Sequence, residues 1–219
     1  IAVLVSLIFL YLNCLPKSWT KHEDRISFAL VQPNLPPLLH WDEAINGSRL
    51  AQLAQEIIRA HLLEFDILMR SAAVTPNAIK GDSKTLSFFE SLVANQNRPI
   101  LTGNLAYYSE SNRWYNGIFL IEPKTGLNPI YYAKKRLVPF GEYTPKPFKG
   151  IMESFAGLQG AFYPGTTDGI IPIHLKGRTY AFGTLICYED TFPEFARETV
   201  RAGADIIYVA TNNAWYGEE

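Results

Sequence analysis

The stretch Gly183-Thr-Leu-Ile-Cys-Tyr-Glu-Asp190 passes directly from apolar to polar residues and decides how the chain can fold. Residues 179–187 have the composition of a buried strand, and a helix is predicted over residues 192–202. A cysteine at such a boundary lies at a sheet edge, near backbone N–H groups that can hold an oxyanion. The commoner meaning of this pattern is a small buried hydrophobe, so Cys187 stays a candidate nucleophile beside that alternative.

Outward from this stretch, strand-like and helix-like segments alternate along the chain, which predicts an α/β fold built in layers. The further predicted strands cover residues 26–31, 66–69, 99–105, 114–121, 128–133 and 205–210. Helical periodicity covers residues 41–65 and 86–94.

Composition favours one packed domain and gives no support to several functions. Of the 219 residues, 47% are hydrophobic and 19% are charged, which is typical of a globular chain. The formal net charge of −1 gives no support for nucleic-acid binding, which usually shows a basic patch, or for polybasic attraction to a membrane surface. Neither cysteine has a histidine at metal-ligand spacing, so no metal and no cofactor are expected.

The two ends of the chain carry predictions about its organisation. Residues 1–16 are mostly apolar but shorter than the roughly 20 residues that span a bilayer. We interpret them as the end of a transmembrane helix, with a signal-peptide core as the alternative. Residues 17–25 are then a linker, and residues 26–219 form the folded domain. Because the last strand is followed only by a polar loop, that domain is expected to be incomplete at its C-terminus.

A second segment with candidate chemistry runs over residues 132–145, Tyr-Ala-Lys-Lys-Arg-Leu-Val-Pro-Phe-Gly-Glu-Tyr-Thr-Pro. Three basic residues leave a predicted strand and enter a Pro/Gly-containing loop with one carboxylate. The simpler interpretation is a solvated basic turn. The functional one is that Lys134 stabilises a developing oxyanion, with Glu142 as its local partner.

A third segment, Thr-Asn-Asn-Ala-Trp-Tyr-Gly over residues 211–217, is by itself only a polar loop with aromatic residues. In order and spacing, however, the three segments together resemble the nitrilase (carbon–nitrogen hydrolase) superfamily. The loop over residues 137–145 looks like the apolipoprotein N-acyltransferase branch, as do Val-Gln-Pro-Asn over residues 31–34 and the following Trp41. The resemblance implies an α-β-β-α sandwich.

The resemblance also implies roles for individual residues. Cys187 matches the nucleophile that takes an acyl chain from a phospholipid as a thioester, and Lys134 matches the lysine that stabilises the oxyanion. Glu142 matches a further carboxylate near that lysine. Supporting or substrate-binding positions are Trp41, Tyr188, Glu189 and Trp215. The implied partners are a phospholipid donor, a diacylglyceryl apolipoprotein acceptor and the bacterial inner membrane, with the domain on the periplasmic side.

The sequence departs from the pattern of the family at the expected general base. The family has a glutamate after the strand over residues 66–69, where this chain has Ala72, and Arg70 stands at an aromatic position. A methyl group cannot accept the thiol proton, so this form is expected to be impaired. Two alternatives stay open. A soluble nitrilase-type amidase is disfavoured by the apolar N-terminus and by residues 140–145, and a non-enzymatic, lipid-binding domain of the same fold is favoured by Ala72.

Overall fold

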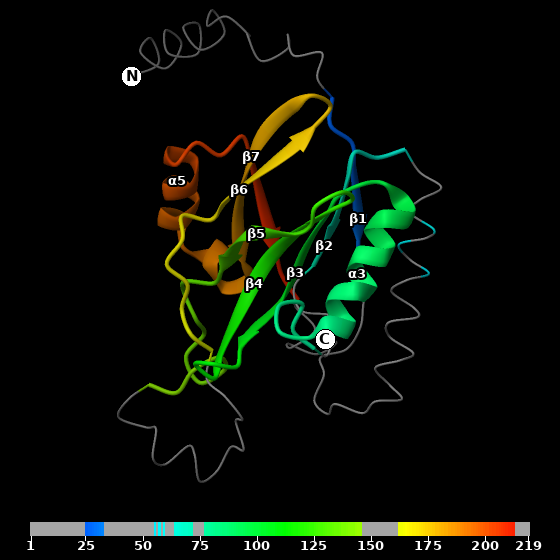
Figure 1. Ribbon diagram of the computed structural model, residues 1–219. Helices are drawn as coiled ribbons and strands as arrows, with labels where there is room; N and C mark the ends of the chain where they lie inside the picture. Colours follow the sequence, from blue (N-terminus) through cyan, green and yellow to red (C-terminus); the bar gives the residue numbers. More distant parts are fainter. Residues whose placement is uncertain are drawn as a thin grey trace, which may run out of the picture.

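The computed structural model describes residues 25–32, 55, 57, 59, 64–71, 77–145 and 162–212 (Figure 1). The predictions for residues 1–16, Trp41, Ala72 and Trp215 lie outside these residues. Among the described residues, no helix is long and apolar enough to cross a bilayer.

Two mixed sheets form the centre of the domain. The first has the strand order β1-β2-β3-β4-β5, with β1, β2 and β3 parallel and β4 antiparallel to both of its neighbours. Its strands are β1 (Phe28–Val31), β2 (Ile67–Arg70), β3 (Ile100–Tyr108), β4 (Arg113–Glu122) and β5 (Gly126–Ala133). The second sheet pairs β7 (Arg178–Ile186) antiparallel to β6 (Ile170–Leu175) and parallel to β8 (Ile206–Ala210).

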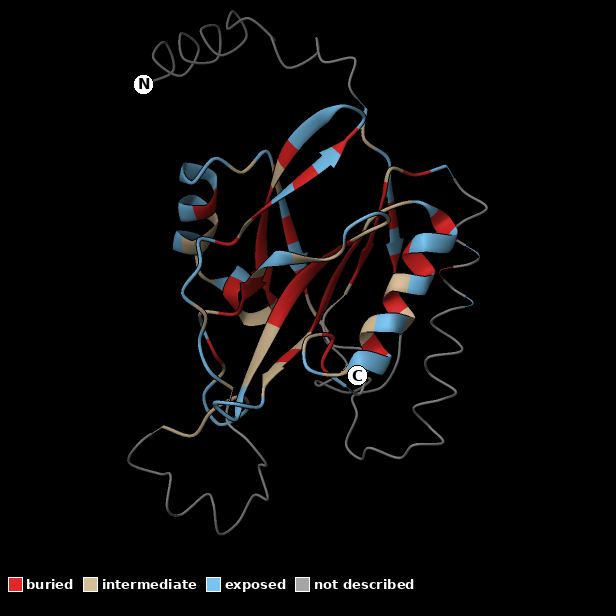
Figure 2. Cartoon of the chain, in the orientation of Figure 1, coloured by how far each residue is buried: buried red, intermediate tan, exposed pale blue. Residues whose placement is uncertain are grey.

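The sheets pack face to face because alternate side chains of their strands are apolar. Met69, Leu120 and Tyr132 of the first sheet lie in one buried cluster with Ile173 and Phe182 of the second. Figure 2 shows the resulting buried strands between more exposed outer surfaces. Burial between two apolar faces is therefore what holds the sheets together.

A helix covers the outer face of each sheet (Figure 1). The helix α3 (Ser83–Gln96) packs Phe89 and Val93 against the first sheet. The helix α5 (Pro193–Arg201) lies so close to β7 that a Cβ atom on Gly183 would stand 2.0 Å from Cγ2 of Thr199. The layers are therefore α-β-β-α, as the resemblance implied.

The sequence patterns placed most described strands within a few residues, with two differences. β6 was not predicted, because Pro172 interrupts a short apolar run; proline is tolerated there because β6 is an edge strand. The strand predicted over residues 179–187 ends at Ile186, and Cys187 begins a short 3-10 helix, η3 (Cys187–Thr191).

An ion pair joins the start of β2 to the β6–β7 turn. Nζ of Lys176 lies 2.9 Å from Oδ2 of Asp66 and donates to the carbonyl of Arg25 at 2.8 Å. The backbone N–H of Ser27 donates to the same Asp66 oxygen at 2.7 Å. Burial alone would raise the pKa of Asp66, but the hydrogen bonds from Lys176 and Ser27 outweigh it and hold that pKa below its ordinary value of 3.8.

Asp66→Asn should lower the free energy of unfolding at neutral pH by about 1 kcal/mol, a small effect because solvent screens this partly exposed pair. Since the folded-state pKa of Asp66 is lowered, its contribution is complete above about pH 4 and is lost as the pH falls through the folded value. Urea unfolding from pH 7 to pH 3 should therefore show the gap between native protein and variant closing below pH 4. A gap that stays constant over this range would contradict the linkage.

Candidate active site

The strands that lead to the candidate residues end at one side of the sandwich. β5 runs in the same direction as β3 and β2, because β3 and β5 are both antiparallel to β4. Lys134 follows β5 directly, and Cys187 follows β7. In α/β sheets, functional side chains gather outside the carboxyl ends of the strands.

Lys134 is buried in an ion pair. Only 1% of its side chain is exposed, and Nζ lies 2.8 Å from Oε2 and 2.9 Å from Oε1 of Glu142. The Lys134 backbone N–H donates to the carbonyl of Asn116 in β4, and its carbonyl accepts from Gly165. A lysine can stay charged at such depth only when it is paired, so Glu142 allows a cation to be held here.

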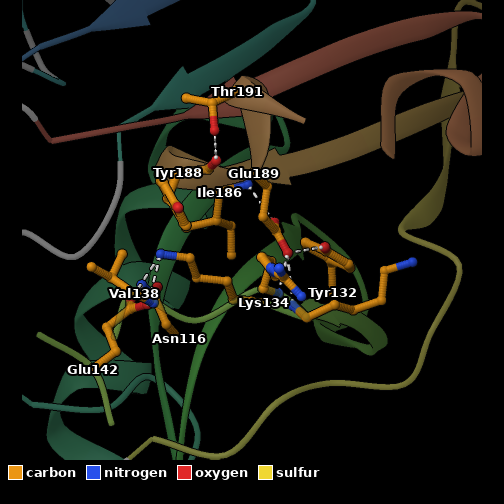
Figure 3. Close-up of polar contacts among 11 residues, drawn as sticks. Asn116, Tyr132, Lys134, Val138, Glu142, Ile186, Tyr188, Glu189 and Thr191 are labelled. Atoms are coloured by element: carbon orange, nitrogen blue, oxygen red, sulfur yellow. Dashed lines mark hydrogen bonds and ion pairs between the residues drawn. The ribbon is translucent and has the colours of Figure 1, made fainter. Parts of the chain in front are cut away.

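Glu142 is itself held by the turn that carries it. The backbone N–H of Val138 donates to Oε2 at 2.8 Å, and Nδ2 of Asn116 donates to Oε1 at 3.2 Å. Figure 3 shows Lys134 extending toward this group. The carboxylate therefore has defined partners besides the lysine, which fixes the position of the ammonium group.

Cys187 adopts an unusual backbone conformation at the junction of β7 and η3. Its φ of 48° lies in the left-handed region, which costs a non-glycine residue about 1–2 kcal/mol. The side chain is half-buried against the core between the sheets, and the thiol is free. Residues held in this way cluster at functional sites, and the partial exposure argues against a purely internal role.

Glu189 connects the residues that directly follow β5 with the last residue of β7. Its side chain is fully buried, and Oε1 accepts from the Tyr132 hydroxyl at 2.8 Å and from the backbone N–H groups of Lys135 and Arg136 at 2.7 and 3.0 Å. Oε2 accepts from the N–H of Ile186 at 2.8 Å. Burial, with the Glu189 charge beside it, raises the pKa of Tyr132 well above its ordinary value. One carboxylate thus connects the residues next to Lys134 with the residue before Cys187 (Figure 3).

The side chains of Lys135 and Arg136, which follow Lys134, also connect the end of β5 with the segment after β7. Nζ of Lys135 lies 5.2 Å from the ring centre of Phe195, and the Arg136 guanidinium lies 5.1 Å from that of Phe192. Cation–π contacts of this kind contribute about 0.5–1 kcal/mol at exposed sites. The basic run is therefore a packed junction rather than a freely solvated turn.

Arg70 stands where the family pattern has an aromatic residue. Its side chain lies on the face of the first sheet that α3 covers, away from the second sheet. It is 1% exposed, and its guanidinium lies 5.6 Å from the ring centre of Phe89 in α3. The hydroxyl of Tyr208 in β8 donates to the Arg70 carbonyl, linking the sheets just before Ser71. Sequence reasoning missed the contributions of Tyr208 and Asn116, because neither residue belongs to a local motif.

Residues of the types that ligate metals do not cluster in the described part of the chain. Within the described residues, no three histidine, cysteine, aspartate or glutamate side chains gather closely enough to hold an ion.

Two packed mixed sheets between helices, with a cysteine after β7 and a buried lysine after β5, define a nitrilase-like α/β fold. The family model for carbon–nitrogen hydrolases matches residues 29–219, and the chain belongs to that family.

Curated relatives narrow the comparison to one branch. The apolipoprotein N-acyltransferase of Geobacter metallireducens is 29% identical over 197 residues, covering 86% of this chain and 36% of the relative. The apolipoprotein N-acyltransferase of Chlorobaculum tepidum is 28% identical over 219 residues, covering 88% of this chain and 40% of the relative. The chain thus spans less than half the length of these relatives.

Solved structures show the same fold. An amidase from Nesterenkonia sp. AN1 superposes with a TM-score of 0.58 at 18% identity, covering 85% of this chain and 67% of the amidase. A carbon–nitrogen hydrolase from Helicobacter pylori G27 gives a TM-score of 0.56 at 16% identity, covering 85% of this chain and 59% of that protein. At these identities the likeness concerns the fold alone.

Proposed function

We propose that this chain carries the catalytic domain of an apolipoprotein N-acyltransferase. The acyl donor is a phospholipid of the bacterial inner membrane, and the acceptor is the α-amino group of an N-terminal diacylglyceryl-cysteine on the periplasmic side. Family membership, the named relatives and the apolar residues 1–16 support this proposal. Like Cys187, the supporting residues Tyr188 and Glu189 come from the exit of β7.

The observation that carries the proposal is the connection made by Glu189. Its hydrogen bonds bring the backbone of Lys135 and the backbone of Ile186 to one buried carboxylate. A thiol and an ammonium group, 53 positions apart in sequence, thereby belong to one structural unit. Nucleophilic acyl transfer needs this combination of an attacking sulfur and a cation near the developing oxyanion.

The proposed reaction has two acyl-transfer steps. The Cys187 thiolate attacks the ester carbonyl of the phospholipid, Lys134 stabilises the oxyanion, and the lysophospholipid alkoxide leaves and takes up a proton. The acceptor amine then attacks the thioester, gives up a proton and forms the amide, which releases the Cys187 thiolate. A general base serves both proton transfers, and Ala72 supplies none.

A non-catalytic, lipid-binding domain of the same fold is the second candidate. The observation that favours it is Ala72, since a methyl group at the position of the base removes the proton acceptor. Under this candidate Cys187 binds no acyl group covalently, whereas slow thioester formation is expected under the first.

Acyl transfer from a labelled phospholipid to the full chain in membranes distinguishes the two candidates. The label should appear slowly on Cys187 as a hydroxylamine-sensitive thioester, located by peptide mass spectrometry because Cys14 is a second thiol. Cys187→Ser should abolish the thioester, whereas Cys14→Ser should leave it unchanged. A thioester that persists in Cys187→Ser would exclude Cys187 as the nucleophile, and no label in either protein would favour the non-catalytic domain.

A further inference from the structure

We infer that a cavity beside β5 is a binding site for a small anionic group with the chemistry of a phosphate. The cavity has a volume of about 270 Å³ and is lined by β5, by β3, β4 and the turn between them, and by the segment 164–167. That volume lies just below the range of pockets for drug-sized molecules, which favours a small ligand. The inference goes beyond acyl transfer and does not depend on it.

The cavity lies on the face of the first sheet that α3 covers. Tyr131, which lines it, packs against the apolar cluster beneath α3, whereas Tyr132, the next residue, lies between the two sheets. Successive side chains of a strand point to opposite faces. One wall reaches the backbone of Lys134, because Ala133 precedes it and the N–H of Gly165 donates to its carbonyl at 2.8 Å. The cavity is therefore outside the space between the sheets, on the strand that leads to Lys134.

Two phenols at the cavity leave one hydroxyl proton for a ligand. The hydroxyls of Tyr108 and Tyr131 lie 2.9 Å apart, and either of them can be the donor. The pair has two protons and uses one of them in the bond that joins the two oxygens. Among the described residues, neither hydroxyl donates to a further acceptor. The wall that these two residues form therefore offers a donor, and a ligand there supplies the acceptor.

Lys80 adds a positive charge beside this pair. Its Nζ lies 4.9 Å from the ring centre of Tyr108 and 5.1 Å from that of Tyr131. Burial alone would raise the pKa of Tyr108, but its hydrogen bonds with Lys80 and Tyr131 and the charge of Lys80 hold that pKa below its ordinary value. A phenol polarised in this way is a stronger hydrogen-bond donor. In the described part of the chain, Lys80 forms no ion pair with a carboxylate, so its charge favours an anion.

The backbone fixes the position of Lys80 before a ligand binds. The N–H of Tyr107 donates to the Lys80 carbonyl at 2.7 Å, and the Lys80 N–H donates to the carbonyl of Leu105 at 3.5 Å. Gly81, with φ at 119°, permits this approach, because a Cβ atom there would stand 2.6 Å from the carbonyl oxygen of Tyr107. A charge that is already in place costs less to use in binding than one that must first be ordered.

The groups around the cavity suit a phosphate better than an uncharged ligand. None of the described residues that line it is acidic, and Ser111, Thr166 and Thr167 add three hydroxyl side chains. A neutral polyol could use the hydroxyls but would leave the charge of Lys80 without a partner. A phosphate combines negative charge with several acceptor oxygens. A free phosphate and a lipid head group share this chemistry, so the test includes both sources.

Titration calorimetry of the full chain in nonionic detergent tests the site with two probes, inorganic phosphate and dihexanoylphosphatidylglycerol. Sodium chloride holds the ionic strength constant, because salt screens exposed charges. We expect saturable phosphate binding with a dissociation constant on the order of 1 mM. Lys80→Met should weaken this binding about tenfold, because it removes one charged contact. Lys80→Arg keeps the charge and the ring contacts, so its affinity should stay within about twofold of that of the native protein.

Lys84→Met is the matched control, because it removes the same charge from an exposed lysine four positions later, in α3. It should leave the phosphate affinity unchanged. Thr166→Glu decides the question if Lys80→Met fails to fold, because Thr166 is exposed at the cavity. A carboxylate there should repel phosphate and weaken its binding about tenfold at an unchanged melting temperature.

The two probes also identify the source of the phosphate group. Lipid binding at least as tight as phosphate binding, and weakened by Lys80→Met, would identify a lipid head group as the ligand. Binding of inorganic phosphate without binding of the lipid would identify a free phosphate. Lack of saturable binding of either probe would overturn the inference, as would equal losses in Lys80→Met and Lys84→Met. None of these outcomes bears on acyl transfer, which is measured as the thioester on Cys187.

Discussion

Replacing Ala72 with glutamate should raise the rate of Cys187 acylation by about 10²-fold or more, since a positioned general base contributes roughly 10²–10⁴-fold. Ala72 follows Ser71, which directly succeeds β2, and β2 runs in the same direction as β5. Under the proposed function, a carboxylate introduced there takes the thiol proton as the sulfur attacks. The rate is measured as hydroxylamine-sensitive label transferred from phospholipid to the full chain in membranes.

Ala73→Glu is the control for this experiment, because it adds the same charge one position further along the chain. It should leave the acylation rate within about twofold of that of the native protein. Equal gains in the two variants would mean that the added charge acts without the geometry of a base. If Ala72→Glu gives no gain, either the assigned base position is wrong or another change in the sequence limits the rate.

Glu189→Ala should lower the free energy of unfolding by about 3–5 kcal/mol, because it removes the acceptor for the Tyr132 hydroxyl and for three backbone N–H groups. These donors are buried or partly buried, so water cannot fully replace the carboxylate. Glu189→Gln should lose less, since its amide keeps one acceptor oxygen but turns an NH₂ group toward the remaining donors. Urea unfolding measures both effects.

Asp190→Asn is the matched control for Glu189, because it changes the adjacent, exposed carboxylate in the same 3-10 helix. Its effect on unfolding should stay within about 0.5 kcal/mol. If Glu189→Ala cost no more than Asp190→Asn, the carboxylate would not be what joins the exits of β5 and β7. The proposed unit of Lys134 and Cys187 would then need another physical basis.

The candidate site was predictable from sequence where its contacts are local. Glu142 follows Lys134 by eight positions in a loop with proline and glycine, so a local partnership between the two could be proposed from spacing. The role of Glu189 could not, because its donors at Tyr132, Lys135 and Arg136 are 53 to 57 positions away. Pairs this distant meet only when β5 and β7, which belong to different sheets, are packed together.

Sequence patterns also did not predict the conformation of Cys187. An apolar run predicts that a strand continues, yet the strand ends at Ile186 and Cys187 turns into a left-handed conformation. An asparagine or a glycine at this position would have predicted such a turn, because these residues tolerate a positive φ. Here the hydrogen bond from the Ile186 N–H to Glu189 and the surrounding packing stabilise it instead.

By itself, the sequence determined the alternation of strands and helices, the layered α/β class and the positions of Lys134 and Cys187 at strand ends, because hydrophobic periodicity and turn residues act over short distances. Only the tertiary structure decided that Lys134 is buried against Glu142, that Arg70 turns toward α3, and that one carboxylate holds two strand exits together. Those outcomes depend on which faces of the two sheets meet, and burial between distant segments has no signature in the local order of residues.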